Sequence, residues 1–69
     1  MSDNGYKVTE VVGTSETSIE DAIKGAIERT AQTVRDIGWF EVTETRGHVV
    51  DGKVEHFQVT LRIGFHLKD

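Results

Sequence analysis

Residues 39–67 read WFEVTETRGHVVDGKVEHFQVTLRIGFHL, two long stretches rich in β-branched and aromatic residues that flank the pair Asp51-Gly52. An Asp-Gly pair in this position predicts a β-hairpin with a type I′ turn, because both turn residues need a positive φ. We therefore predict two antiparallel strands, over 39–50 and 53–67. This hairpin decides the fold.

The second stretch alternates between two kinds of side chain, which is typical of a strand with one buried face. One face carries only apolar residues: Phe57, Val59, Leu61, Ile63, Phe65 and Leu67. The other carries His56, Gln58, Thr60, Arg62, Gly64 and His66. We expect the apolar face to lie under a helix.

The turn also fixes a register for the hairpin. If Asp51 and Gly52 are the two loop residues, Val50 faces Lys53 and the other pairs follow. The apolar face then pairs Phe40 with Ile63, Val42 with Leu61, and Glu44 with Val59. The polar face pairs Trp39 with Gly64, Glu41 with Arg62, Thr43 with Thr60, and Thr45 with Gln58. Arg46 falls opposite Phe57, on the face away from Trp39.

The first half of the chain predicts one strand and one helix. Tyr6–Val12 alternates as a strand does, and Gly13-Thr14-Ser15 is expected to break it. Ser18, with Asp21 three residues later, resembles a capping box, although Thr14 and Ser15 are rival caps. Apolar residues then recur at steps of three and four, which is the pattern of one helical stripe: Ile19, Ala22, Ile23, Ala26, Ile27, Thr30, Ala31, Val34 and Ile37. Gly38 is expected to end this helix in a left-handed conformation.

The predicted fold class is therefore α+β, with the order β-α-β-β and the helix packed across an antiparallel sheet. The 69 residues leave room for a single domain, 1–69, in which residues 1–5 are expected to fray. A domain of this size has a marginal core, and small scaffolds usually gain stability from disulfides, metals or oligomerisation.

Composition excludes some of these sources of stability and some classes of function. The chain has no cysteine, and its three histidines lack companions at metal-ligand spacing along the sequence. We therefore expect a homo-oligomer and no metal site. The net charge of −4 argues against nucleic-acid binding. The polar N-terminus does not resemble a signal peptide, which favours a cytoplasmic location.

Trp39 is the candidate binding residue that the register singles out. It is the chain's one tryptophan, and it lies opposite a glycine on a face that is otherwise polar. A bare backbone beside an indole leaves room for a second planar group, and aromatic groups favour offset stacking. Alternatively, Trp39 packs a subunit contact and Gly64 marks a bulge. The residues alone favour this second interpretation, and composition names no ligand.

The order and spacing of several motifs resemble the dodecins over Tyr6 to Leu67. The resemblance rests on five segments: Val11-Val12-Gly13-Thr14-Ser15, Gly38-Trp39-Phe40-Glu41-Val42, Thr45-Arg46-Gly47-His48 through Asp51-Gly52, His56-Phe57-Gln58-Val59, and Ile63-Gly64-Phe65. The resemblance implies β-α-β-β subunits that assemble as hollow twelve-subunit spheres. It also implies a bound flavin, FMN in bacterial members, with two rings stacked between tryptophans at a two-fold axis.

Three residues are assigned to that flavin by resemblance. Trp39 would stack on the ring, Gln58 would hydrogen-bond its polar edge, and Arg46 would hold the ribityl-phosphate end. The register independently places Trp39 and Gln58 on one face, whereas Arg46 falls on the other face. Arg46 would therefore act from a neighbouring subunit or from beside a bulge. The alternative role for Arg46 is a salt bridge with Glu44 or Glu55.

The resemblance implies storage of the flavin and quenching of its photochemistry rather than catalysis. The chain has no cysteine nucleophile and no serine in a strand-turn-helix elbow. Some bacterial dodecins also resemble coenzyme A binders, and the matching positions here include Arg29, Thr33 and Arg35. This chain has His66 where such members carry an arginine, so solvated helix charges are the better interpretation. The rival function is a purely structural homo-oligomeric module without a cofactor.

Overall fold

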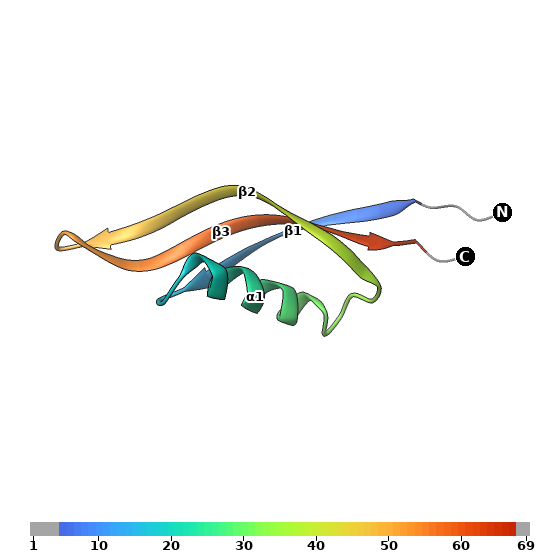
Figure 1. The fold of residues 1–69 in the computed structure, drawn as a ribbon, viewed down its shortest axis with the longest axis horizontal. Helices are drawn as coiled ribbons and strands as arrows, with labels where there is room; N and C mark the ends of the chain where they lie inside the picture. The colour runs from blue at the N-terminus through green and yellow to red at the C-terminus, as the bar shows by residue number, and fades with distance from the viewer. Residues whose placement is uncertain (1–4, 68–69) are drawn as a thin grey trace.

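A three-stranded antiparallel sheet and one helix form the described part of the chain, residues 5–67 of the computed structural model (Figure 1). The elements are β1 (Tyr6–Ser15), α1 (Ile19–Thr30), β2 (Ile37–Val50) and β3 (Lys53–His66). The central strand is β3, and both neighbours run antiparallel to it. This arrangement confirms the predicted β-α-β-β fold class. Among the described residues, no helix has the length and apolar character that crossing a bilayer requires.

The β2–β3 turn has the predicted geometry. Asp51 has a φ of 53° and Gly52 a φ of 74°, and Val50 pairs with Lys53. Two consecutive positive φ angles are the requirement of a type I′ turn, which explains the Asp-Gly pair. Residues 1–4, expected to fray, lie outside the described residues. Gly5, expected to fray with them, accepts a hydrogen bond from the Leu67 amide at 3.2 Å.

The hairpin register departs from a regular ladder at three points. Gly38 and Thr43 are extra residues on β2, and Glu55 is an extra residue on β3. Each is a β-bulge, in which two residues of one strand oppose a single residue of its partner. The predicted pairs at the open end of the hairpin are confirmed: Trp39 with Gly64, Phe40 with Ile63, Glu41 with Arg62, and Val42 with Leu61.

The predicted pairs between the bulges at Thr43 and Glu55 are wrong by one residue. The structure pairs Glu44 with Thr60, Thr45 with Val59, Arg46 with Gln58, and His48 with His56. Because a shift of one residue moves a side chain to the other face, Glu44 and Arg46 leave the apolar face on which the regular register had placed them. Thr43 is left without a ladder partner, and its hydroxyl donates to the Thr60 carbonyl at 3.3 Å.

The first strand continues through the segment that was expected to break it. Gly13 pairs with Val59 and lies within β1. A Cβ on Gly13 would overlap the Ala22 carbonyl oxygen and lie 2.9 Å from the Ala26 Cβ. This glycine therefore permits close approach of helix and strand instead of ending the strand.

The helix begins as predicted but ends earlier. The Ser18 hydroxyl accepts a hydrogen bond from the Asp21 amide at 2.9 Å, which confirms Ser18 as the N-cap. The helix ends at Thr30, and Gln32 and Thr33 donate to carbonyls three residues back. The expectation that the helix reaches Ile37 and ends in a left-handed Gly38 is wrong. The positive φ falls at Asp36, whose carbonyl accepts from the His66 amide at 2.9 Å, so the chain has already rejoined the sheet.

The core is small and lies between α1 and the strands β1 and β3. Its buried apolar residues are Ala22, Ala26, Val59, Leu61 and Ile63. The helix contacts mainly β1 and β3, so it covers only part of the predicted β2–β3 ribbon. The hairpin extends past the helix (Figure 1). The Cα radius of gyration, 14.4 Å, exceeds the roughly 11 Å expected of a compact chain of this length.

Candidate functional site

The candidate site lies on the outer face of the sheet, which we define as the face away from α1. Val59, Leu61 and Ile63 are fully buried toward the helix. Since β3 pairs with β1 in regular register from Phe57 to His66, the alternate residues of β3 lie on the outer face. These residues are Gln58, Thr60, Arg62, Gly64 and His66.

Trp39 and Gly64 form one end of the outer face. A Cβ built on Gly64 would overlap the indole of Trp39, so the indole lies directly over the bare backbone at position 64. The Tyr6 ring lies 6.0 Å from the indole, centroid to centroid, at an interplanar angle of 55°. Tyr6 is held in turn by His66, because its hydroxyl and the His66 Nε2 are 3.1 Å apart. The indole is half-buried by these contacts.

Gln58 and Arg46 form a second polar group on the same face. They are direct partners across the β2–β3 ladder, so their side chains project to the same side of the sheet. The guanidinium of Arg46 also lies 4.0 Å from the Glu44 carboxylate, and both side chains are exposed. The alternative salt bridge with Glu55 does not form, because Glu55 lies against His56. An exposed pair at this distance contributes little to stability and leaves the guanidinium available.

Trp39 and Gln58 of one chain are too far apart to bind the same ligand ring. Gly64 and Gln58 are six residues apart on a regular strand, which corresponds to about 20 Å. A planar tricyclic ligand stacked on Trp39 therefore cannot reach Gln58 of the same chain. A site that uses both residues needs a second copy of the outer face, turned end to end.

The donor chemistry of this face suits a flavin nucleotide. The indole offers a flat apolar surface, and Gly64 adds no side chain that would fill the space beside it. The Gln58 amide both donates and accepts, which matches the alternating carbonyl and N–H groups of a flavin ring edge. The Arg46 guanidinium presents a fork of donors that fits a phosphate. The residues present therefore fit the group that the sequence suggested.

The helix residues expected at a coenzyme A site are only partly brought together. Arg29 and Thr33 line a hollow of about 400 Å³ between α1 and β1, which Gly13 and Gly25 also border. Arg35 is not among the lining residues. His66 lies elsewhere, against Tyr6 on the outer face.

A large apolar groove on the helix side remains open in the single chain. It has a volume of about 780 Å³, and its apolar lining includes Ile23, Ile27, Ile37 and Phe40. Phe40 is 48% exposed there although it pairs with the buried Ile63. An apolar surface of this kind is typical of an interface between protein chains.

The structure also brings together three side chains that the sequence pattern did not single out. His48, Glu55 and His56 each offer one metal-ligating atom, and these atoms all lie within 4.8 Å of one another. Along the sequence the two histidines have no ligand-like spacing, because their proximity arises across the hairpin. The one signal in the sequence was the turn itself. A regular register from Asp51-Gly52 pairs His48 with Glu55, which already places two metal-ligating residues across the hairpin.

Comparison with known proteins gives a consistent result. The family model described as Dodecin matches residues 6–68. The dodecin of Thermus thermophilus is 45% identical over 64 residues, which cover 93% of this chain and 93% of the relative. The structure of dodecin from Streptomyces coelicolor superposes with a TM-score of 0.92 at 49% identity, covering 100% of this chain and 99% of the other. A calcium-chelating dodecin from Mycobacterium tuberculosis, with a calcium-binding site, is more distant: TM-score 0.80, 34% identity, and 93% and 91% of the two chains covered.

Proposed function

We propose that this chain, which belongs to the dodecin family, binds FMN by stacking the flavin ring against Trp39 and so stores and shields it. The observation that carries the proposal is the common face of Trp39 and Gln58. The indole of Trp39 lies over Gly64 of β3, and Gln58 lies on the same face of β3 as Gly64.

The site would be completed by a second subunit. The strand spacing separates Trp39 from Gln58 of its own chain by about 20 Å, so one ring would contact the indole of one subunit and the amide of another. A two-fold axis through the outer face meets this need, because it brings each residue of one copy toward the other end of its mate. We extend the same arrangement to a dodecamer, since dodecins are multimeric assemblies. The exposed apolar groove beside Phe40 supports further contacts between copies.

Arg46 supports the choice of FMN over riboflavin. It lies directly across from Gln58, so a ring edge held by the amide would place a neighbouring phosphate within reach of the guanidinium. The Glu44 carboxylate is 4.0 Å from the guanidinium and exposed. Loss of this ion pair to a phosphate would therefore cost little free energy.

The arrangement favours sequestration over catalysis. A bound flavin supplies a ring that absorbs light and exchanges electrons. Trp39 would cover one face of that ring, and the symmetry-related site would cover the other, which blocks the approach of a substrate. An indole in van der Waals contact is also a ready electron donor to an excited ring, so contact with Trp39 would quench its fluorescence and suppress its photochemistry.

A fluorescence titration tests the proposal. Flavin-free protein added to FMN should abolish most of the flavin emission and saturate at one flavin per chain. Trp39→Ala should remove the quenching, whereas Trp39→Phe should retain stacking but quench less, because a phenyl ring is a poorer electron donor. Unchanged emission with the wild-type protein would instead support a purely structural module.

A second binding function has one observation in its favour. Arg29 and Thr33 line the hollow between α1 and β1, which offers a cation and a hydroxyl to a nucleotide phosphate such as that of coenzyme A. Calorimetric titration of coenzyme A into wild-type protein and Arg29→Ala tests this function. Coenzyme A binding is excluded if the wild type gives no heat of binding. Arg29 is excluded as a ligand if both proteins give equal heats.

We do not extend calcium binding from the mycobacterial relative to this chain. Calcium prefers six to eight oxygen ligands. Within residues 5–67, the cluster of three ligating groups contains two imidazoles and a single carboxylate.

A further inference from the structure

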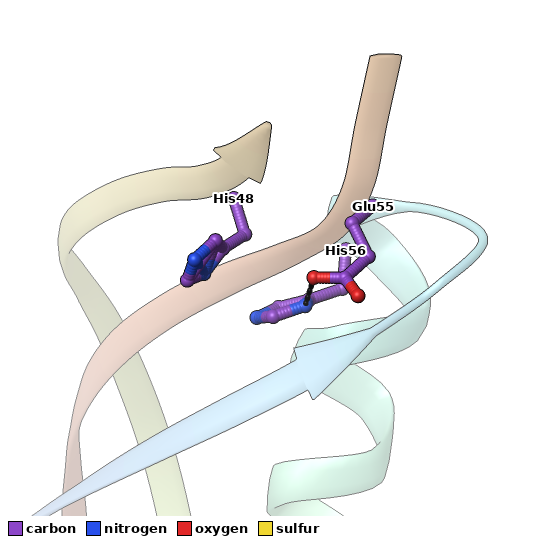
Figure 2. Close-up of side chains that lie close together, drawn as sticks. All are labelled: His48, Glu55 and His56. Atoms are coloured by element: carbon purple, nitrogen blue, oxygen red, sulfur yellow. Dashed lines mark ion pairs between the residues drawn. The ribbon is translucent and has the colours of Figure 1, made fainter. Parts of the chain in front are cut away.

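The cluster near the hairpin turn has the composition of a transition-metal site. His48 comes from β2, and Glu55 and His56 come from β3 (Figure 2). Their ligating atoms all lie within 4.8 Å of one another. The Glu55 carboxylate is 3.4 Å from Nδ1 of His56, and the two imidazole centroids are 5.2 Å apart. Two nitrogens and one oxygen therefore converge on one volume of space.

The bulge at Glu55 creates this convergence. In a regular strand, neighbouring residues point to opposite faces, so Glu55 and His56 could not act together. Here consecutive residues His48 and Val49 pair with His56 and Val54, and Glu55 is the additional residue between them. A bulge re-aims a side chain, and the Glu55 carboxylate comes to lie beside the imidazole of His56. The same shift places His48 directly across from His56.

The cluster is also accessible. His48 and Glu55 are exposed, and the His56 side chain is 29% exposed. A hollow of about 320 Å³ adjoins His56 and is lined on its other side by Thr14, Ser15 and Glu16. Within residues 5–67, the His48 side chain makes no hydrogen bond or ion pair, and its ring contacts only the ring of His56. Its nitrogens are therefore open to a ligand.

We propose that His48, His56 and Glu55 bind a divalent metal ion of the Zn²⁺ class. Imidazole nitrogens with one carboxylate suit zinc, copper or nickel, whereas calcium and magnesium favour oxygen. Zinc–imidazole bonds of about 2.0–2.1 Å require tetrahedral ligand atoms about 3.3 Å apart. Side-chain rotation of the exposed His48 and Glu55 covers the difference from the present spacing. Three protein ligands leave a fourth position for water or for a donor from another molecule.

The alternative is an ordinary surface cluster with no metal. The convergence of two imidazole nitrogens and one carboxylate oxygen within 4.8 Å favours the metal site, because this ligand set suits a cation that accepts nitrogen ligands. The cluster lies at the opposite end of the hairpin from Trp39. It adjoins the pair Gln58 and Arg46, because His56 and His48 are the next pair on the same face.

Zinc titration of the full chain tests the proposal, with protein free of a histidine tag and treated with a chelator. Calorimetry should show one saturable zinc site per chain. Loss of a residue that only supports a metal ligand typically lowers affinity by roughly 10- to 100-fold. His48→Ala and His56→Ala should each lower zinc affinity by more than this. Glu55→Ala should weaken it less. Glu20→Ala is the control, because this carboxylate pairs with Lys24 on the helix at 3.1 Å, on the other side of the sheet, and should leave zinc affinity unchanged.

A measurement on the wild-type protein guards against misfolded variants. In NMR spectra of the imidazole nitrogens, zinc should shift the signals of His48 and His56. Excess calcium should not displace the zinc. The proposal is overturned by non-saturable binding, by retained affinity in both His48→Ala and His56→Ala, by an equal loss in Glu20→Ala, or by imidazole signals that do not respond.

Discussion

Arg46 lies directly opposite Gln58 on the outer face of the sheet, and the bulge at Thr43 puts it there. Without that extra residue on β2, the guanidinium would project toward the helix side, away from the amide. The bulge therefore assembles a cation and an amide on the face that also carries Trp39. In the proposed flavin site, the amide would hold the ring edge and the guanidinium would hold the phosphate.

This relationship predicts a difference between two flavins. Arg46→Ala should weaken FMN binding by about 10- to 150-fold, which is the loss of a charged hydrogen bond worth about 1.5–3 kcal/mol, and should leave riboflavin binding unchanged. Gln58→Leu should weaken both ligands equally, because both share the ring. Lys24→Ala is the control: this lysine pairs with Glu20 on the helix, at 3.1 Å. Equal losses of FMN and riboflavin in Arg46→Ala would contradict a phosphate contact.

The space over Gly64 leads to a second prediction. A Cβ at this position would overlap the Trp39 indole, so Gly64→Ala must displace the ring that is proposed to stack on the flavin. We expect at least a tenfold loss of flavin affinity while the fold persists. Flavin fluorescence quenching measures the affinity, and circular dichroism monitors the fold. Full quenching at wild-type affinity in Gly64→Ala would show that the position of the indole is unimportant.

Two glycines against the helix provide a matched test of packing. Gly13→Ala would overlap the Ala22 carbonyl oxygen and press on Ala26, and overpacking of this kind costs about 1–3 kcal/mol. A Cβ on Gly25 meets no atom within 4 Å, so Gly25→Ala should stabilise the helix by about 0.5–1 kcal/mol. Denaturant unfolding at a fixed protein concentration measures both changes. Similar effects for the two substitutions would contradict the close approach of α1 to β1.

The apolar groove predicts that a charge will disrupt assembly. Phe40 is 48% exposed and lines the groove with Ile27 and Ile37. Phe40→Glu should shift the protein from a large species to smaller ones, because it places a charge where another copy is expected to pack. Light scattering measures the mass. Glu28→Gln, which removes a charge from the rim of the same groove, should leave the mass unchanged.

The sequence predicted the parts of the fold that a hydrophobic pattern marks. The alternation of β3 identified the buried face, and Asp51-Gly52 fixed the turn and the pair Val50–Lys53. Trp39–Gly64 and Glu41–Arg62 were also predicted correctly, because the bulges at Thr43 and Glu55 offset each other by the time β2 reaches Val42. The helix start followed from the capping residue Ser18.

The errors lie where the sequence is polar on both faces. Between Thr43 and His48 no apolar alternation marks the register, so a one-residue bulge leaves no trace in the pattern. Arg46 was therefore assigned to the wrong face, and the contact of His48 with His56 was not expected. Gly13 and Gly38 suggested a strand break and a helix end, whereas tertiary contact and a bulge are their actual roles.

The central claim is that two copies of the outer face complete each flavin site, and sedimentation of the protein with FMN tests it most directly. Absorbance should be recorded separately in the flavin band and in the protein band. We predict that the flavin sediments only with a multi-subunit species, at one flavin per chain. Flavin that moves with a single chain of 7.7 kDa, or an assembly that sediments without flavin when FMN is in excess, would contradict it.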